Sequence, residues 1–263
     1  MTEPLVLLSS GDGIATLTLN RPQARNALSE DMLTALKSTI QSIDSDENLR
    51  VVIVEGNGPG FCAGHDLKEM NGHRQDDDGG RGYFERLFAA CSDVMLSIVQ
   101  SPKIFIAKID GIATAAGCQL VAACDMAIAS DHARFGVNGI NAGLFCSTPM
   151  VSLSRNAGRK AAMELLTTGH LMSAPEAANA GVINKFVSTD QLDEAVATMA
   201  NAVAEKPASV LALGKQAFYR QLEMPLDEAY AHTSKVITDN MMMDAACEGI
   251  SAFIEKRKPE WKA

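Results

Sequence analysis

Two loops of small residues could bring backbone N–H groups close to a ligand. "CAGHDL" (62–67) follows the apolar run 51–55, and "GIATAAG" (111–117) follows the apolar run 104–109. Small residues let a backbone approach a ligand closely, and the carboxyl ends of parallel strands are where α/β proteins bind ligands. Two N–H groups converging from these loops would form an oxyanion hole. Tight turns needed only for packing would give the same spacing, so the pattern alone leaves both interpretations open.

Gln119 is the polar side chain that follows the second loop, in "TAAGCQL" (114–120). A catalyst of proton transfer would need a carboxylate beside the N–H groups, because an amide has essentially no basicity at neutral pH. The residues therefore predict a binding site and leave open whether a reaction takes place there.

Other motifs exclude several classes of site. A G-x-G-x-x-A pattern runs from Gly58 to Ala63, but Pro59 interrupts it, whereas a dinucleotide fingerprint opens directly into a helix. The chain has no Walker A lysine, no G-x-S-x-G elbow and no H-E-x-x-H pair, and its five histidines are scattered. We expect neither a metal site nor nicotinamide chemistry.

The composition predicts an ordinary globular protein that binds neither nucleic acid nor a membrane. Of 263 residues 47% are hydrophobic and 21% charged, with a net charge of −9 that opposes general binding of nucleic acid or anionic lipid. The six cysteines form no C-x-x-C pair, which indicates reduced thiols. No secretory signal and no membrane-spanning run is present. These features predict a cytoplasmic location.

Alternating strands and helices predict an α/β fold with a largely parallel sheet in the first part of the chain. Ser29 can cap a helix whose apolar residues Met32, Leu33, Leu36, Ile40 and Ile43 keep helical spacing. The expected strands are 5–10 and 13–19, joined by a turn, and then 51–55, 104–109 and 126–130.

The pattern becomes almost wholly helical from about residue 149. Thr148 and Pro149 look like an N-cap and first helical residue, and "SAPE" (173–176) has the form of a capping box. Long helices are expected over 190–205, 208–222 and 226–256. The polar segment 75–82 is expected to be a mobile loop. We divide the chain into a core, 1–200, and a C-terminal helical region, 201–263.

Four segments resemble the crotonase, or enoyl-CoA hydratase/isomerase, superfamily. They are "NRPQARNAL" (20–28), "FCAGHDLKEM" (61–70), "DGIATAAGCQLVAACDMAIAS" (110–130) and "GRKAAMELLTTGHLMSAPEAANAGVINKFV" (158–187). The tail "EGISAFIEKRKPEW" is also similar. The resemblance implies a spiral of ββα units with a C-terminal helical trimerisation region, assembled as a homotrimer or homohexamer. It implies an acyl-CoA thioester as substrate or ligand, and no permanently bound cofactor.

The resemblance also implies site residues. The oxyanion-hole N–H groups would be those of His65 and Ala116, although the family commonly has glycine at the second position. Nine further positions match those that contact coenzyme A, the last two often from a neighbouring subunit: Ala24, Arg25, Ala27, Ala63, Asp66, Leu67, Lys68, Phe253 and Lys256.

The chain departs from the family at the two glutamates that hydratases use to activate water. Those positions are Gln119 and Gly139 here, so we expect little ordinary hydration. The stretch "NAGLFCSTP" (141–149) most resembles the subgroup called enoyl-CoA hydratase domain-containing protein 3. Four other carboxylates could substitute from nearby segments, although turn contacts explain some of them: Asp66, Glu69, Glu85 and Asp110.

Three functions stay open at this point. The first is an acyl-CoA lyase or isomerase with atypical residues, for which enoyl-CoA hydratase is the conventional label. The second is an acyl-CoA decarboxylase that uses the oxyanion hole and His65, since "AGHDL" also looks like the loop of methylmalonyl-CoA decarboxylases. The third is a non-catalytic acyl-CoA-binding protein. Cys146 could be a nucleophile, but its apolar neighbours favour a packing role.

Overall fold

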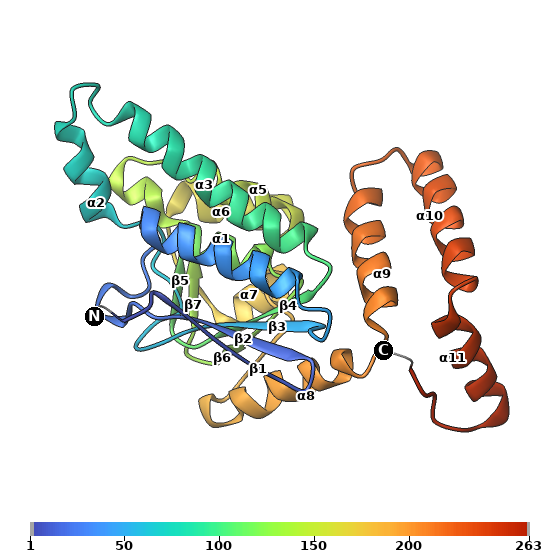
Figure 1. The fold of residues 1–263 in the computed structure, drawn as a ribbon. Coiled ribbons are helices and arrows are strands. Elements are labelled where there is room, and N and C mark those ends of the chain that lie inside the picture. Colours follow the sequence, from blue (N-terminus) through green and yellow to red (C-terminus); the bar gives the residue numbers. More distant parts are fainter. Residues whose placement is uncertain (1–2, 262–263) are drawn as a thin grey trace.

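The computed structural model describes residues 3–261. Its main sheet has six strands in the order β1-β2-β3-β4-β6-β9 (Figure 1). β1 and β2 form an antiparallel hairpin, and every later pair in this sheet is parallel. The strands are β1 (Val6–Gly11), β2 (Ile14–Leu19), β3 (Val51–Gly56), β4 (Ile104–Ile109), β6 (Met126–Ser130) and β9 (Lys185–Val187).

A second sheet of three short strands carries the loops of interest. β7 lies between β5, to which it is parallel, and β8, to which it is antiparallel. An isolated bridge between Cys62 and Ala113 joins the loop after β3 to β5. These strands are β5 (Ile112–Thr114), β7 (Arg134–Gly136) and β8 (Met172–Ser173).

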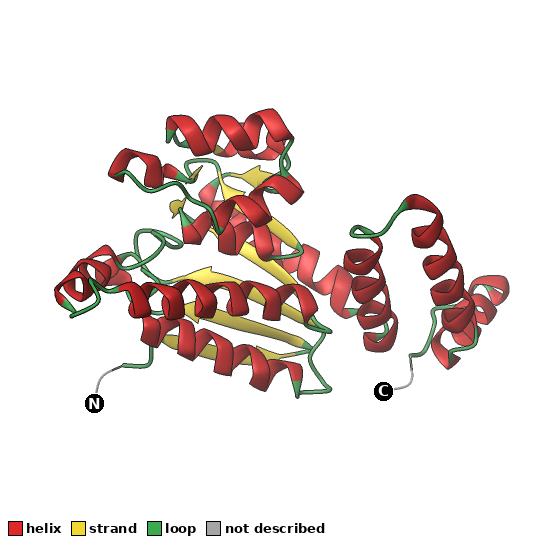
Figure 2. Ribbon diagram, turned by 90° about the horizontal axis from the view of Figure 1, so that it is seen from above, coloured by secondary structure: helices red, strands yellow, loops and turns green. Residues whose placement is uncertain are grey.

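Helices cover both faces of the main sheet. Figure 2 shows α1 and α3 side by side across one face, and α8 packs against β3, β4 and β6. Buried strand residues alternate between the two sides, so Val52 and Val54 join the larger core while Val51 packs against Leu192 and Val196 of α8. The first seven α-helices are α1 (Glu30–Asp44), α2 (Leu67–Gly72), α3 (Arg81–Gln100), α4 (Ala116–Ala123), α5 (Pro149–Asn156), α6 (Arg159–Thr168) and α7 (Ala174–Ala180).

Short 3₁₀ segments connect several of these elements: η1 (Pro22–Ala24), η2 (His73–Gln75), η3 (Asn138–Ala142) and η4 (Thr189–Gln191). Two helix starts follow the prediction. The hydroxyl of Ser29 accepts the Met32 N–H at 3.2 Å, and Ser173 and Glu176 form a complete capping box. Thr148 makes no side-chain cap, because its backbone is already helical.

The C-terminal part consists of α8 (Leu192–Ala204), α9 (Ala208–Gln221), α10 (Leu226–Met241) and α11 (Asp244–Glu255). The helical stretch expected over 226–256 consists of two helices, α10 and α11. The helix is interrupted at Met243, whose ψ of 145° leaves the helical region. The predicted loop 75–82 is wrong in part, because α3 begins at Arg81 and the Asp78 carboxylate accepts the N–H groups of Gly80 and Gly82.

α9 is fixed to the core by a buried ion pair, whereas α10 and α11 stand apart (Figures 1 and 2). Lys215 Nζ lies 2.7 Å from Asp125 Oδ2 and also donates to the carbonyls of Ile98 and Lys103. Tyr219 donates to Asp125 Oδ1 at 2.8 Å. The division expected after residue 200 falls inside α8. Within residues 3–261, none of the helices is long and apolar enough to cross a membrane.

Candidate active site

Backbone hydrogen bonds hold the loop after β3 between the 24–28 turn and β5. The Ala63 N–H donates to the Arg25 carbonyl at 3.0 Å, and the Leu28 N–H donates to the Gly64 carbonyl at 2.8 Å. On the other side, the Thr114 N–H donates to the Cys62 carbonyl at 3.0 Å. The two loops singled out from the sequence therefore lie next to each other.

Asn26 anchors this arrangement. Its side chain is fully buried, and Nδ2 donates to the carbonyls of Asn57, Gly60 and Phe61 at 2.9–3.0 Å. Oδ1 accepts the Arg21 N–H at 2.9 Å. The sequence reasoning missed this residue. The available signal was a second asparagine inside a short polar turn, which alone does not identify a buried anchor.

Gly64 is the point of closest approach between the two loops. A Cβ on Gly64 would lie 2.9 Å from the Thr114 carbonyl oxygen and 3.3 Å from the Ala116 nitrogen, and its φ is +90°. Only glycine tolerates both the contact and the conformation. The backbone that leads into His65 therefore passes directly against the N-terminus of α4.

The N–H groups of His65 and Ala116 are both free in the described part of the chain, where no protein acceptor receives either of them. Ala116 is the first residue of α4, and a first-turn N–H has no partner within its helix. Alanine fits there because the residue is helical, whereas the preceding Ala115 adopts φ +49° and ψ −119°, a strained conformation for any residue but glycine. Gly117 is required, since its Cβ would lie 2.1 Å from the Cys62 carbonyl.

The His65 side chain is a neutral hydrogen-bond acceptor. Its Nδ1 lies 3.4 Å from the Leu28 carbonyl oxygen, which can only accept, so Nδ1 carries the proton. Its Nε2 is enclosed and without a partner among residues 3–261, and the ring packs edge-on against Phe88. Burial lowers the pKa of His65, which keeps the imidazole uncharged at neutral pH.

Gly139 faces a filled space. A Cβ on Gly139 would lie 2.8 Å from both Cys146 Sγ and the Leu144 carbonyl oxygen. The Leu144 N–H also donates to the Gly139 carbonyl, so the 139–146 segment folds on itself. Burial raises the pKa of Cys146, which makes it a thiol packed against the glycine. A glutamate at this position would require the segment to move.

Asp66 is engaged in structural contacts. Its side chain caps α2 by accepting the N–H groups of Lys68 and Glu69, and it lies 2.7 Å from Arg21 Nη1. Burial would raise the pKa of Asp66, but Arg21 and the two N–H groups lower it below its usual value.

The cationic side chains of Arg25 and Lys68 differ from Asp66 in being exposed. Neither has a carboxylate partner in the described structure. Leu67 is 59% exposed beside them, while Ala27 is buried and Ala24 and Ala63 are half-buried. The structure thus brings seven of the nine predicted coenzyme A positions together, in the 24–28 turn and the 63–68 loop.

Phe253 and Lys256 are not part of this group within one chain. Phe253 lies in the last turn of α11 and Lys256 directly follows that helix, which lies on the opposite side of the molecule from α2 in Figures 1 and 2. Phe253 is 85% exposed.

The four alternative carboxylates are largely occupied. Asp66 and Glu85 form ion pairs with Arg21 and Arg81, and Asp110 Oδ1 lies 3.2 Å from His132 Nε2. Glu69 accepts the Glu30 N–H through Oε1, while its Oε2 is enclosed without a partner among the described residues. Residues 3–261 also contain no cluster of three His, Cys, Asp or Glu side chains that could hold a metal ion.

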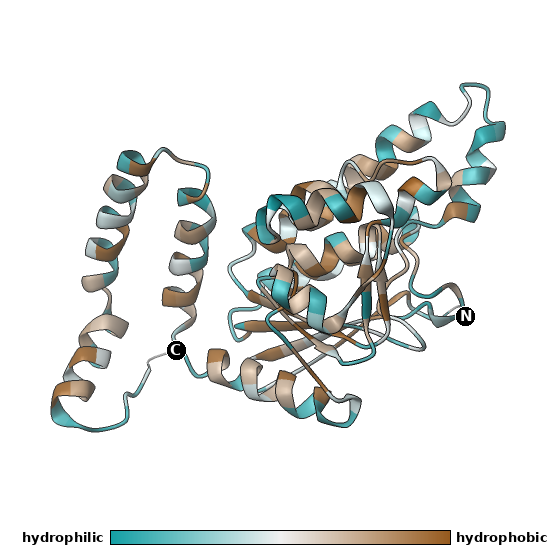
Figure 3. Ribbon diagram, turned by 180° about the vertical axis from the view of Figure 1, so that it is seen from behind, coloured by the Kyte–Doolittle hydropathy of each residue, from teal (hydrophilic) through white to brown (hydrophobic). Residues whose placement is uncertain are grey.

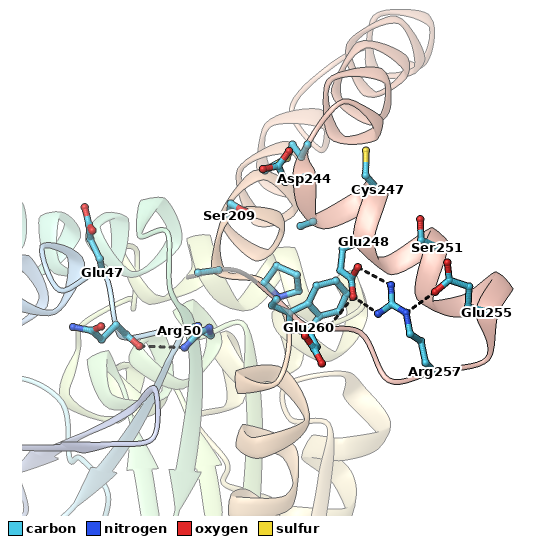
Figure 4. A pocket seen from close by; sticks show the side chains of 16 residues that line it. Glu47, Arg50, Ser209, Asp244, Cys247, Glu248, Ser251, Glu255, Arg257 and Glu260 are labelled. Carbon is cyan, nitrogen blue, oxygen red and sulfur yellow. Dashed lines mark hydrogen bonds and ion pairs between the residues drawn. The ribbon is translucent and has the colours of Figure 1, made fainter.

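A cavity of about 980 Å³ lies elsewhere, between the loop after α1 and the helices α9 and α11 (Figure 4). Glu47 and Arg50 line it from the core, and Arg257 and Glu255 from the C-terminal end. Arg257 is paired there with Glu248 at 2.6 Å. None of the predicted site residues lines this cavity, so it is not the candidate active site.

A mostly parallel sheet, a small second sheet and two free N–H groups at the junction of their loops define a protein of the crotonase type. The chain belongs to the enoyl-CoA hydratase/isomerase family, which it matches over residues 9–263. Both the predicted resemblance and the predicted fold class are therefore confirmed.

Individual relatives are similar over almost the whole chain. Enoyl-CoA hydratase domain-containing protein 3, mitochondrial, is 46% identical in Rattus norvegicus, covering 95% of this chain and 82% of the relative, and 44% identical in Homo sapiens, covering 95% and 81%. The crystal structure of the human protein superposes with a TM-score of 0.93 at 43% identity, covering 98% of this chain and 100% of the other. A crystal structure described as enoyl-CoA hydratase from Mycobacterium smegmatis superposes with a TM-score of 0.94 at 52% identity, covering 98% of this chain and 99% of the other.

The predicted cytoplasmic location is wrong by this comparison, because the similar rat, mouse and human proteins are named mitochondrial. The cysteine pattern does not distinguish these compartments. Free thiols, which all six cysteines have, indicate only reducing surroundings, and several compartments share that property.

Proposed function

We propose that this protein binds an acyl-CoA thioester and stabilises negative charge on the thioester oxygen with the N–H groups of His65 and Ala116. The observation that supports the proposal is the close approach of Gly64 to the Ala116 nitrogen, together with the lack of a protein acceptor for the N–H groups of His65 and Ala116 among the described residues. One such donor is worth about 2.7–4 kcal/mol in a well-organised oxyanion hole. The thioester is then a substrate or ligand, with no permanently bound cofactor.

The coenzyme A portion would lie along the 24–28 turn and the 63–68 loop. Exposed Arg25 and Lys68 would meet the phosphates, as charge-assisted contacts in an otherwise acidic protein. Phe253 and Lys256 would reach the same ligand from a neighbouring subunit, since α11 lies far from the site in its own chain.

Assembly as a homotrimer or homohexamer supports this arrangement. Hydrophobic residues appear along the C-terminal helices in Figure 3, and a solitary chain would leave many of them in water. The exposed large ones are Phe218, Leu222, Leu226, Tyr230, Ile237, Met241, Met242, Ile250, Phe253 and Ile254. Light scattering should give three or six chains per particle, and a monomer would contradict the assembly.

Ordinary hydration of enoyl-CoA is not part of the proposal, although several relatives are called hydratases. Gln119 cannot act as a base, and Cys146 occupies the space that a side chain at residue 139 would need. General acid–base help is typically worth 10²–10⁴-fold.

Decarboxylation through His65 is less well supported than enolate stabilisation. After loss of CO₂ the enolate needs a proton, but the only proton of a neutral His65 is held on Nδ1 beside the Leu28 carbonyl. The free Nε2 can accept a proton and cannot donate one.

The proposal is tested by calorimetric binding of butyryl-CoA and of its thioether analogue S-butyl-CoA, which lacks the carbonyl. Two hydrogen bonds to the carbonyl should make butyryl-CoA bind roughly 5- to 100-fold more tightly. Gly64→Ala should abolish the difference, because the new Cβ would separate the loop from α4. Equal affinities in the wild type would overturn the oxyanion hole.

The same preparation is then given crotonyl-CoA, and loss of the enoyl absorbance is followed. Binding without turnover supports the proposal. Rapid hydration would mean that a carboxylate elsewhere in the chain activates water. Glu69 would then be the first residue to substitute. Failure of every thioester to bind would contradict the proposal as a whole.

A further inference from the structure

The C-terminal tail doubles back along α11. The helix ends at Glu255, and Lys256 then takes φ +55°, a left-handed conformation that usually belongs to glycine at this position. The Arg257 N–H donates to the Ala252 carbonyl at 3.0 Å, which closes a turn of the Schellman type. The chain therefore returns toward the start of the helix that it has just left. We call residues 256–261 the strap.

Glu248 holds the strap along α11. Its two carboxylate oxygens accept hydrogen bonds from the two terminal nitrogens of Arg257 at 2.6 and 2.9 Å, and Oε1 also accepts the Glu260 N–H at 2.7 Å. The ring of Trp261 lies against the next residue of the helix, because a Cβ on Gly249 would lie 3.2 Å from it. The strap is therefore fixed to two successive residues of α11.

The end of the strap crosses to α8. The Trp261 Nε1–H donates to the carbonyl of Glu205, the residue that directly follows α8, at 2.8 Å. α8 in turn packs against β3, β4 and β6 of the main sheet. The pair formed by α10 and α11 is therefore attached to the rest of the chain at two places, through the turn 222–225 that follows α9 and through the indole of Trp261.

The cavity of about 980 Å³ separates α11 from the core (Figure 4). Glu47 and Arg50 line it from the loop after α1, and Asp244, Cys247 and Ser251 line it from α11. Atoms on opposite sides of such a space make no van der Waals contact, so packing across the cavity does not set the direction of α11. The strap is the connection that can set it.

We propose that the strap fixes the direction in which α10 and α11 project from the core, and that detaching Trp261 frees this pair to move as one body. α9 stays in place, because the buried pair of Lys215 and Asp125 holds it on the core. The inference rests on the proposed function in one respect. A symmetric assembly needs every subunit to present its helices in the same direction, so release of the strap should weaken the assembly.

The first test uses Trp261, the single tryptophan of the chain, as its own probe. Gly249→Leu would put a side chain where the indole lies, and it should not weaken α11 itself, because leucine forms helix far better than glycine. Acrylamide should quench the wild-type fluorescence less than that of a peptide of residues 256–261. In Gly249→Leu the quenching should approach that of the peptide. Ser251→Leu, exposed on the same helix, is the matched control and should behave as the wild type.

Hydrogen exchange of the backbone amides then locates the motion. In Gly249→Leu, exchange in α10 and α11 should rise roughly 2- to 10-fold, the effect of one neutral hydrogen bond, while α9 and the main sheet keep the wild-type rates. Trp261→Phe, which keeps a ring and loses the N–H, is the second variant and should show the same pattern. No rise in either variant, or an equal rise in α9, would overturn the inference.

Light scattering on dilution separates the inference from the proposed assembly. Dissociation of Gly249→Leu at a higher concentration than the wild type would support the link between strap and assembly. Full assembly of a variant whose indole is freely quenched would overturn that link. A monomeric wild type would contradict the proposed assembly instead, and the exchange rates of α10 and α11 would still decide whether the strap holds them.

Discussion

The sulfur of Cys146 lies 2.8 Å from the point at which a side chain on Gly139 would begin. The two residues are seven positions apart, and the turn between them is closed by the hydrogen bond from Leu144 to Gly139. The space beside the Gly139 Cα is therefore filled by Cys146 and by the Leu144 carbonyl. A larger side chain at residue 139 would require the whole 139–146 segment to move.

Gly139→Ala should destabilise the protein by about 1–3 kcal/mol, the usual cost of overpacking. The cost should shrink when Cys146→Ala is added, because the sulfur is one of the two atoms in the way. Urea denaturation of the two single variants and the double variant measures this coupling, expected at about 0.5 kcal/mol or more. Strict additivity would show that the two side chains do not compete.

Restoring both carboxylates should not restore hydration. In Gln119→Glu with Gly139→Glu, the second glutamate would be displaced by the Leu144 carbonyl and by Cys146, which leaves no pair positioned around a water. The enoyl absorbance of crotonyl-CoA should decay no faster than with the wild type. An increase in the hydration rate of about 10²-fold or more, the low end of general acid–base catalysis, would show that the 139–146 segment moves to accommodate the second glutamate.

Gly117→Ala should disrupt the junction of the two loops, since its Cβ would lie 2.1 Å from the Cys62 carbonyl and a backbone atom cannot turn aside. We expect a loss of about 3 kcal/mol or more. Gly214→Ala is the matched control: this glycine is inside α9 with open space around it, and alanine should stabilise by about 0.5–1 kcal/mol. Thermal unfolding should separate the two variants in opposite directions.

The depressed pKa of His65 predicts a stability that falls in mild acid. The unfolded chain binds a proton near the ordinary value of 6.5, whereas the buried imidazole resists it, so protons favour unfolding. The contribution is complete above that value and is lost as the pH falls below it, toward the folded-state pKa.

His65→Gln removes this titration and keeps the backbone N–H. The wild type should lose more free energy of unfolding than the variant between about pH 7.5 and 5.5. The other histidines cancel in the difference between the two proteins. Parallel curves would mean that folding leaves the pKa of His65 unchanged.

The regular elements were predictable because their signals are local. The apolar runs of β3 and β4, the cap at Ser29 and the capping box at Ser173 each depend on residues within one element. The failures share a different cause. The interruption of the helical stretch at Met243 falls on a residue that is a good helix former, so local propensity does not predict it.

The sequence indicated which loops would meet, but not the contacts between them. The two small-residue loops were singled out by their composition, the family resemblance pointed to His65 and Ala116 within them, and the structure brings the Gly64 backbone of one loop against the Ala116 nitrogen of the other. The anchoring by Asn26 and the contact between Gly139 and Cys146 were not foreseen, because each joins residues by close approach in space. Spacing along a chain carries little information about such contacts.

Lys215→Met should cost about 3–5 kcal/mol, because removing one partner leaves the Asp125 carboxylate buried without its cation. The hydrogen bonds from Phe105 and Tyr219 remain on Asp125 and limit the loss. Lys206→Met, in the exposed turn between α8 and α9, should stay within about 0.5 kcal/mol of the wild type. Urea denaturation measures both. A small loss in Lys215→Met, equal to that of the control, would mean that the ion pair does not hold α9 on the core.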